Sequence, residues 1–224
     1  MVIAIDGPAG SGKSTTAKYV AENLGFIHIN TGAMYRGIAL KCISEDINLA
    51  DTSKMNHMLH LTVFKFGGGD GSELYMDGKN ISSNINTVEV TESVSLISAI
   101  PMVRKKLVEY QREMANGIDV VLEGRDIGSV VFPDADYKFF LIADIHERAR
   151  RRQKEMEERC EVISLSELTV ELEERDRQDS TREHSPLKKA DDAVEIDTTG
   201  LSIEEQVNRI VEIVTNTNRS KTRK

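Results

Sequence analysis

The sequence predicts an α/β fold in which a parallel β-sheet is covered by helices. Short apolar runs at residues 2–5 and 26–29 alternate with segments whose apolar residues recur at helical spacing. The links between these segments are short, and such alternation is typical of parallel strands joined by helical crossovers. The middle of the chain differs, because two alternating stretches there are separated by glycines and followed by an Asp-Gly pair. We therefore expect a small antiparallel meander inserted into the α/β core.

The first part of the chain is interpreted as strand, helix, strand, helix. The run 2–5 is a buried strand, and a helix follows it until Gly25, a residue that commonly ends helices. The apolar face of this helix comprises Ala17, Val20, Ala21 and Leu24. Residues 26–29 form the second strand, from which we expect His28 to face outward. Helical spacing resumes over about residues 33–43.

The meander lies in the middle of the chain. Residues 61–66 and 73–76 are predicted strands, and the glycine-rich stretch 67–71 is the turn between them. The Asp-Gly pair at 77–78 is a strong hairpin signal, after which 79–81 returns as a third strand.

The second half of the chain returns to alternating elements. Helices are expected over about residues 90–97, 101–117 and 145–159, and from Ser164 and Ser202 onward; strands are expected over 119–122, 137–143 and 193–197. Pro101 suits the first turn of its helix, and Ser164 with Glu167 forms a possible capping box. The polar and basic tail from Thr215 is expected to fray.

Composition limits the class of protein. The chain has 224 residues, 39% of them hydrophobic and 29% charged, with a net formal charge of −8, which disfavours binding to nucleic acid. No apolar stretch is long enough to span a membrane, and the first strand begins too early to leave room for a signal peptide. Cys42 and Cys160 lack the spacing of a metal or redox pair, so both are interpreted as free thiols. We expect a single cytosolic domain, 1–224, with no membrane or nucleic-acid partner.

A glycine-rich segment connects the first strand to the first helix and has the pattern G-x-x-x-x-G-K-S. Its residues are Gly7, Pro8, Ala9, Gly10, Ser11, Gly12, Lys13, Ser14 and Thr15. Between a strand and a helix, this pattern predicts a phosphate-binding loop whose backbone N–H groups and helix dipole face an anion. Lys13 would reach the β- and γ-phosphates, and the Ser14 hydroxyl would ligate Mg²⁺. An ordinary glycine turn with a surface lysine is the alternative, which the strand–helix context disfavours. The fold class is therefore a P-loop NTPase.

The phosphate loop alone does not choose among kinases, switches and motors. A GTPase would need a guanine-reading N-K-x-D segment, which the sequence lacks. Residues 197–200 fit the D-x-x-G switch pattern by letters but lie too near the end of the chain. A motor would be expected to have a longer chain and a basic track for its polymer.

Arginines gather where parallel strands are predicted to end. Arg36 lies one helical turn after the second strand, and Arg125 follows the strand 119–122. A third group continues the helical spacing of Leu168 and Leu172, and it comprises Arg175, Asp179 and Arg182. Ligands of such sheets bind beyond the carboxyl ends of the strands, and arginine binds phosphate oxygens in pairs. Surface ion pairing is the alternative to phosphate binding. The two interpretations are equally supported for Arg148, Arg150, Arg151, Arg152 and Lys154.

Five segments together resemble the bacterial cytidylate kinases. They are the phosphate loop GPAGSGKST, residues 30–36 (NTGAMYR), 123–128 (EGRDIG), 132–135 (FPDA) and 174–177 (ERDR). The similarity covers essentially the whole chain, including the meander. It implies a nucleoside monophosphate kinase that moves the γ-phosphate of ATP to CMP or dCMP, with Mg²⁺. Glu123 departs from the pattern, in which aspartate is more often expected.

The resemblance also implies roles for individual residues. Residues 7–15 bind ATP; Lys13, Arg125 and Arg175 are catalytic; and the substrate-binding set is Thr31, Arg36, Ser95, Arg104, Arg125, Asp126, Arg175, Asp179 and Arg182. Within that set, Ser95, Arg104 and Asp126 would read cytosine, which offers the O2 and N3 acceptors and the N4 donor. The alternative for Asp126 is an ion pair that only orients Arg125.

The family further implies a core, a part that binds the monophosphate and a mobile lid. We place the monophosphate-binding insertion at about 53–100 and the lid at about 151–164, and we expect a monomer. Another monophosphate kinase, acting on UMP and CMP, is the nearest alternative, and a nucleotide-dependent switch is a more distant one.

Overall fold

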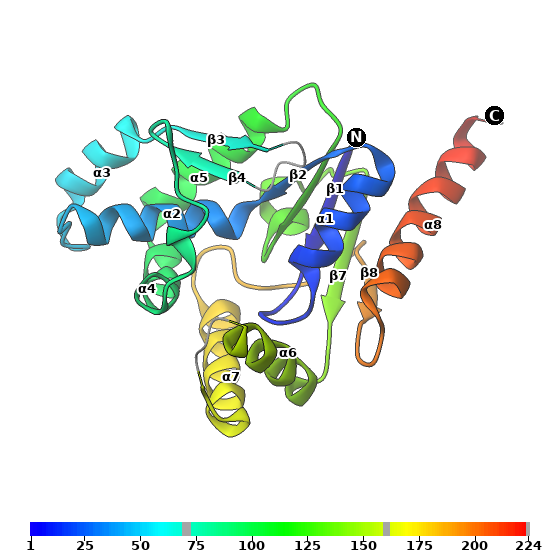
Figure 1. The fold of residues 1–224 in the computed structure, drawn as a ribbon. Helices are drawn as coiled ribbons and strands as arrows, with labels where there is room; N and C mark the ends of the chain where they lie inside the picture. Colours follow the sequence, from blue (N-terminus) through cyan, green and yellow to red (C-terminus); the bar gives the residue numbers. More distant parts are fainter. Residues whose placement is uncertain (69–72, 159–161, 223–224) are drawn as a thin grey trace.

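A parallel five-stranded sheet, in the order β2-β6-β1-β7-β8, runs through the centre of the molecule (Figure 1). The computed structural model describes residues 1–68, 73–158 and 162–222, with backbone only for 217–222. The strands of this sheet are β1 (Val2–Asp6), β2 (Ile27–Asn30), β6 (Val120–Gly124), β7 (Tyr137–Ile142) and β8 (Val194–Asp197). The helices are α1 (Lys13–Leu24), α2 (Thr31–Ser44), α3 (Thr52–Leu61), α4 (Val88–Ala99), α5 (Pro101–Met114), α6 (Ile145–Glu157), α7 (Leu165–Thr181) and α8 (Ile203–Thr222).

Helices cover both faces of the sheet, as the apolar strand runs predict. Ile3 and Ile5 of β1 point to one face, where they join a core with α1 and α8. Ala4, between them, points to the opposite face and packs with Leu122 and with the end of α5. Since successive side chains of a strand alternate between faces, only a strand buried on both sides is apolar throughout. The prediction of a parallel sheet covered by helices is confirmed.

The phosphate loop and the segment that contains Arg125 both begin at the same edge of the sheet. β1 and β6 are neighbours in register, with Asp6 opposite Gly124. The phosphate loop leaves β1 directly after Asp6, and Arg125 follows Gly124. Two segments more than a hundred residues apart in sequence therefore lie side by side at the carboxyl ends of the strands.

The small second sheet is the predicted antiparallel meander. It consists of β3 (Phe64–Gly67), β4 (Glu73–Met76) and β5 (Lys79–Asn80), in that order. Its buried side chains, Phe64 and Leu74 among them, join the core that α2, α4 and α5 share. The turn after β4 has both Asp77 and Gly78 at positive φ, as the hairpin signal requires.

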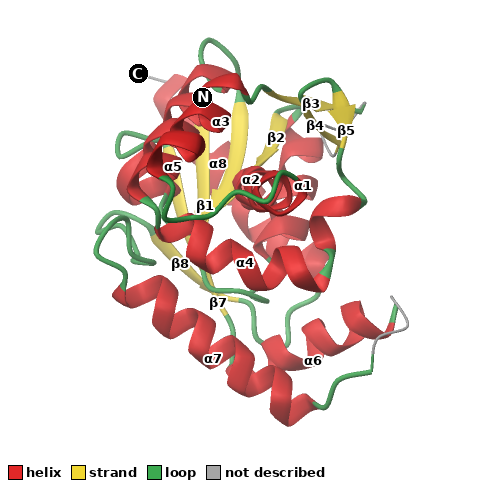
Figure 2. Ribbon diagram, turned by 90° about the vertical axis from the view of Figure 1, so that its left-hand side faces the viewer, coloured by secondary structure: helices red, strands yellow, loops and turns green. Residues whose placement is uncertain are grey.

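Helices α6 and α7 form a separate layer below the sheet (Figure 2). Ala149 of α6 packs with Leu168 and Leu172 of α7, and this small core includes Ala9 of the phosphate loop. The predicted capping box of α7 is present, because the Ser164 hydroxyl accepts from the Glu167 backbone N–H and the Glu167 side chain accepts from the Ser164 N–H.

Some predicted details are wrong. His28 is 6% exposed, so it faces inward, and Ile27 beside it is the outward residue. Residues 61–63 are not strand, because α3 extends to Leu61. This helix was not predicted, although Asp51 caps it and Met55, Met58 and Leu59 form its buried face. The polar tail from Thr215 is part of α8, which extends to Thr222.

Three predictions concern residues without a described placement. Cys42 is a free, buried thiol, whereas Cys160 lies outside the described residues. The same holds for positions 69–71 of the predicted glycine turn and for 159–161 of the predicted lid. Among the described helices, none has the length and apolar character needed to cross a membrane.

Candidate functional site

The phosphate loop is held close to the surrounding backbone, and glycine is required for that. A Cβ atom on Gly7 would lie 2.2 Å from the Leu141 carbonyl oxygen. Gly12, at the start of α1, has a φ of 88° in the left-handed region that glycine adopts without strain. The loop therefore has the compact turn that its sequence predicts, directly before the N-terminus of α1.

Lys13 is buried within this turn. Its side chain is 6% exposed, and its ammonium group donates to the Pro8 carbonyl at 2.9 Å. Burial, aided by the charge of Arg125, lowers the pKa of Lys13 to about 7. A negative charge placed beside the ammonium group would favour its charged form and raise this pKa again.

Ser14 has a partner that was not assigned from the sequence. Its hydroxyl donates to Glu123 Oε1 at 2.8 Å, and Glu123 is 3% exposed at the end of β6. Glu123 stands directly before Gly124 and Arg125, so the strand-end argument used for Arg125 applies equally to it. A hydroxyl oxygen and a carboxylate oxygen thus meet beside the phosphate loop.

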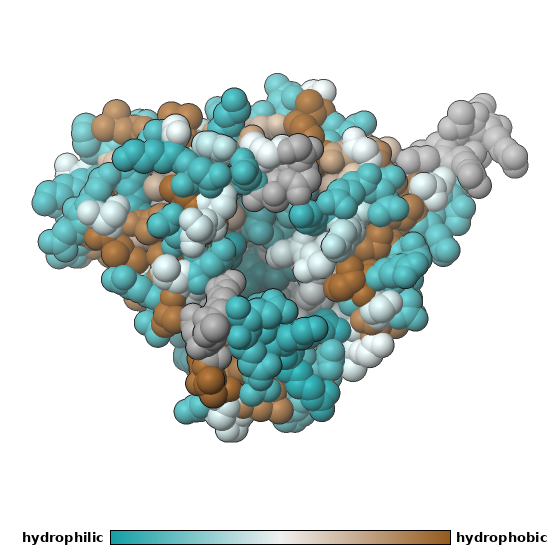
Figure 3. Space-filling view, in the orientation of Figure 1, coloured by the Kyte–Doolittle hydropathy of each residue, from teal (hydrophilic) through white to brown (hydrophobic). Residues whose placement is uncertain are grey.

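The predicted site residues come together in one cleft. All nine predicted substrate-binding residues line it, and so do Ala9, Gly10, Lys13 and Ser14 of the loop. The other predicted loop residues, Gly7, Pro8, Ser11, Gly12 and Thr15, do not line this cleft. Figure 3 shows the hollow at the centre of the molecule, with hydrophilic residues in its depth.

One end of the cleft contains a buried ion pair. Arg104, from α5, donates to the Asp126 carboxylate, and both residues are 5% exposed. The Arg104 guanidinium also lies over the Tyr35 ring, 5.4 Å from its centroid, and donates to the Ser98 carbonyl. Ser95, from α4, also lines the cleft. This end of the cleft therefore combines a planar donor, the Arg104 guanidinium, with an acceptor, the Asp126 carboxylate, and an aromatic ring, that of Tyr35.

The other arginines gather around Asp179. Arg125 Nε donates to Asp179 Oδ2 at 2.8 Å, and Arg182 Nη1 lies 3.5 Å from Asp179 Oδ1. Burial raises the pKa of Asp179, but these positive charges outweigh it and hold the pKa below its ordinary value. Burial and the charge of Arg125 lower the pKa of Arg175 to about 10. Arg36 completes the predicted cluster at the wall of the cleft.

The cleft is basic although the chain is acidic. Seven basic and five acidic side chains line it, in a chain whose net formal charge is −8. The basic residues include Lys13 of the phosphate loop and Arg125, directly after β6. Such a local excess favours a ligand with several negative charges, as phosphate groups have.

Asp6 is a further buried acid that was not singled out from the sequence. Its carboxylate accepts the backbone N–H groups of Ile127 and Gly128, each at 2.8 Å. Burial raises the pKa of Asp6 to about 7 despite these bonds. The contacts fix the start of a short π-helical turn, Ile127–Val131, directly after Asp126. Asp6 therefore connects the strand that bears the phosphate loop to the segment that bears Arg125 and Asp126.

Comparisons with known proteins agree with this arrangement. The sequence matches the model of one family, described as cytidylate kinase, over residues 3–216. A cytidylate kinase of Lactobacillus johnsonii is 47% identical over 215 residues, which cover 96% of this chain and 94% of that protein. A cytidylate kinase of Desulforamulus reducens is 49% identical over 209 residues, covering 93% and 94%.

A solved structure shares the fold at low sequence identity. An uncharacterized protein from Eubacterium ventriosum has a TM-score of 0.54 and 13% identity, covering 96% of this chain and 98% of that one. The family itself rests on the sequence matches, which span nearly the whole chain. By those matches, and with the phosphate loop and the arginine cluster in one cleft, this chain belongs to the cytidylate kinase family.

Proposed function

We propose that this chain transfers the γ-phosphate of ATP to CMP or dCMP and so produces ADP and CDP or dCDP. One observation carries the proposal beyond family membership. A phosphate loop, a cluster of arginines and the Arg104–Asp126 pair line the same cleft. The cleft therefore offers separate places for a donor phosphate, an acceptor phosphate and a base.

The donor side is formed by the phosphate loop. Lys13 would bind the β- and γ-phosphate oxygens, and the N–H groups at the start of α1 would donate to the phosphates. The Ser14–Glu123 contact fits Mg²⁺, because that ion prefers oxygen ligands and takes the remainder from water and phosphate. When bound there, Mg²⁺ would neutralise charge on the transferred phosphate.

The acceptor side is formed by the arginines. Arg36, Arg125 and Arg175 would bind the phosphate of the monophosphate, and Asp179 with Arg182 would bind the ribose and its phosphate. The cytosine ring would lie at the Arg104–Asp126 end, with Ser95 beside it, and Thr31 would be a further substrate-binding residue. An arginine complements the O2 and N3 acceptors of cytosine, and a carboxylate complements its N4 donor.

The reaction needs no general base from this chain. The acceptor phosphate is already an anionic nucleophile, so the residues have to hold it in line and stabilise the developing charge. Arg125 and Arg175 would hold the acceptor, while Lys13 would stabilise the leaving ADP oxygens. Closure of the segment 151–164 would exclude water, which otherwise competes for the phosphate.

We further propose that the enzyme is a monomer that acts on free nucleotides. The net charge of −8 disfavours association with nucleic acid or with anionic membranes.

A single coupled assay of ADP release tests the proposal. ATP is supplied with CMP, dCMP, UMP, AMP or GMP in turn, and CMP and dCMP are expected to give the highest kcat/KM. Equal rates with UMP would favour a broader pyrimidine kinase. Loss of ATP that does not depend on any acceptor would favour a nucleotide-dependent switch and contradict the proposal.

A further inference from the structure

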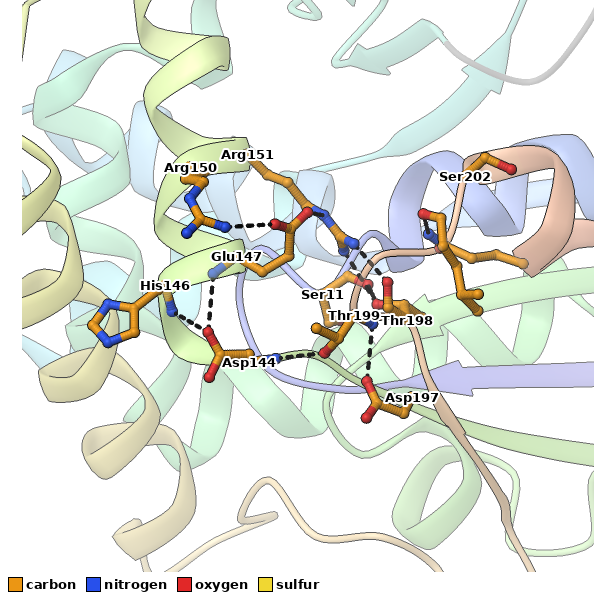
Figure 4. Close-up of polar contacts among 12 residues, drawn as sticks. Ser11, Asp144, His146, Glu147, Arg150, Arg151, Asp197, Thr198, Thr199 and Ser202 are labelled. Carbon is orange, nitrogen blue, oxygen red and sulfur yellow. Dashed lines mark hydrogen bonds and ion pairs between the residues drawn. The ribbon is translucent and has the colours of Figure 1, made fainter.

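The segment 197–200, which resembles a switch motif only by its letters, contacts the phosphate loop. Thr198 follows β8 and is completely buried. Its hydroxyl lies 3.0 Å from the Ser11 carbonyl oxygen and 3.0 Å from that of Ile142, at the end of β7. Figure 4 shows this hydroxyl between the loop and the Arg151 guanidinium.

Arg151 fixes the direction of this contact. Its Nη1 donates to the Thr198 hydroxyl at 3.1 Å, and its Nη2 donates to the Thr198 carbonyl at 2.7 Å. Glu147, one helical turn earlier, accepts from Arg151 Nε at 3.1 Å. Because arginine only donates, the hydroxyl oxygen of Thr198 acts as acceptor toward it. The single hydroxyl proton is thereby directed to the carbonyls of Ser11 and Ile142.

A phosphate loop functions only if its amides face inward. A peptide group is planar and, in this part of the chain, trans, so its C=O and N–H point in opposite directions. If the Ser11 carbonyl is held outward, the Gly12 N–H of the same peptide points into the loop. Anion-binding loops use successive N–H groups in this way.

Three other carbonyls of the loop also have partners. Lys13 donates to the Pro8 carbonyl, Arg148 to that of Ala9 at 3.1 Å, and the Thr16 N–H to that of Gly12. Thr198 is the partner of the Ser11 carbonyl, from a segment far along the chain. Each buried carbonyl needs such a donor, since an unpaired one is costly.

We propose that Thr198 is a positioning residue for the donor loop: its hydroxyl holds the Ser11 peptide so that the Gly12 N–H faces the ATP phosphates. This rests on the proposed function, in which residues 7–15 bind ATP. The hydroxyl is not required to attach the turn to the sheet, because the Thr198 backbone N–H already donates to the Ile142 carbonyl at 2.8 Å. The hydroxyl is therefore free to serve the loop.

The test removes the hydroxyl and keeps the shape. Thr198→Val is expected to weaken ATP binding by about tenfold, equivalent to about 1.4 kcal/mol, when calorimetry measures it without CMP. The KM for CMP is expected to stay within about twofold of wild type, a separation that general destabilisation would not produce. Thr198→Ser retains the hydroxyl and is expected to restore ATP affinity.

Two further variants complete the design. Thr215→Val is the matched control, because its hydroxyl also donates to a backbone carbonyl, that of Val211, within α8. It is expected to change neither nucleotide's binding. Thr198→Ala removes the same hydroxyl without placing a methyl group beside two carbonyl oxygens, and it is expected to repeat the ATP-specific loss.

Three outcomes would overturn the inference. The first is an unchanged ATP affinity in both variants that lack the hydroxyl. The second is an equal loss of affinity for ATP and for CMP that parallels the decrease in Tm. The third is unfolding of both of these variants while Thr198→Ser is folded. Absence of ATP binding by the wild type is a different result, because it would contradict the proposed function itself.

Discussion

Asp126 is paired with Arg104 and not with Arg125, its neighbour in sequence. Arg104 and Asp126 meet in a buried ion pair, whereas Arg125 turns toward Asp179. A role for Asp126 in which it only orients Arg125 is therefore not supported by its contacts. The carboxylate lies instead beside the donor that we assign to the O2 and N3 atoms of cytosine.

Substitution of Asp126 is predicted to change base choice. Uracil has an O4 acceptor where cytosine has the N4 donor, so a carboxylate rejects it. Such a contact is worth about 1–3 kcal/mol, or about tenfold to more than a hundredfold in relative kcat/KM. Asp126→Asn, whose amide can present either group, is expected to lower kcat/KM for CMP and to narrow the CMP-to-UMP ratio.

Asp179→Asn is the matched control for that prediction. It neutralises another buried acid of the cleft, which pairs with Arg125 at the phosphate end, so CMP and UMP should fall by the same factor. Steady-state kinetics with both monophosphates on one preparation measures the ratio. An unchanged ratio in Asp126→Asn would mean that this carboxylate does not read the base.

Removal of the Lys13 ammonium is predicted to abolish transfer without unfolding the chain. Loss of a preorganised charge at the transferred group typically costs about 10²–10³ in kcat, and Lys13→Ala is expected to lose at least that much. The Tm is expected to change little, because the lost bond to the Pro8 carbonyl is offset by the removal of a buried group that is costly to charge. The coupled assay and thermal melting measure the two effects. Substantial remaining activity in a well-folded variant would show that the loop is not the donor site.

Binding of ATP is predicted to take up a proton above neutral pH. The pKa of Lys13 is about 7 in the free protein, so at pH 8 the side chain is mainly neutral. The negative charge of the triphosphate raises that pKa, and the bound form is protonated. ATP affinity should therefore fall as the pH rises from 7 to 9.

Calorimetry at pH 8 in two buffers of different ionisation enthalpy measures this proton. The observed heats should differ for wild type and agree for Lys13→Met, which cannot titrate. Identical heats with the wild type would assign the pH dependence to another group.

The Glu123 carboxylate is predicted to set the Mg²⁺ requirement. Glu123→Gln keeps a partner for the Ser14 hydroxyl but removes the negative charge beside it. The Mg²⁺ concentration for half-maximal activity should rise, with the KM for CMP little changed. Glu171→Gln, which neutralises an exposed acid of the same cleft, should leave the requirement unaltered. If both variants require the same Mg²⁺ concentration, Glu123 does not contribute to Mg²⁺ binding.

The segment 151–164 is predicted to close over the bound nucleotides. Its hydrogen exchange should slow when ATP and CMP analogues are bound together and less with either alone, because closure excludes solvent only when both are present. Mass spectrometry of the exchanged peptides measures this, with α8 as an internal reference. Equal exchange in the free and ternary states would show that this segment is not a lid.

The sequence predicted the site best where local periodicity carries the information. Leu168 and Leu172 are buried, and the same helical face continues into Arg175 and Asp179, which line the cleft. A spacing of 3.6 residues per turn is enough to place these side chains on one face.

Contacts between distant segments were less accessible from the sequence. The Ser14–Glu123 bond joins residues 109 positions apart, and it exists only because β1 and β6 are neighbours. Helix α3 was missed for a different reason. The predicted strand was started at Leu61, which is the last residue of this helix, although the cap and the apolar spacing of the helix are clear in the sequence. The bounds of the lid and the cytosolic location stay predictions.

The position of β1 in the sheet also has a consequence for synthesis of the chain. β1 is made first, yet both of its partners come much later, with Val2 opposite Val120 and Ile3 opposite Tyr137. At about 5–20 residues per second, roughly ten seconds pass before the first partner strand is made. During that interval β1 is an apolar strand with open hydrogen-bonding edges, the kind of segment that other chains capture. The strand that carries the phosphate loop thus has no partner strand of this sheet until β6 has been made.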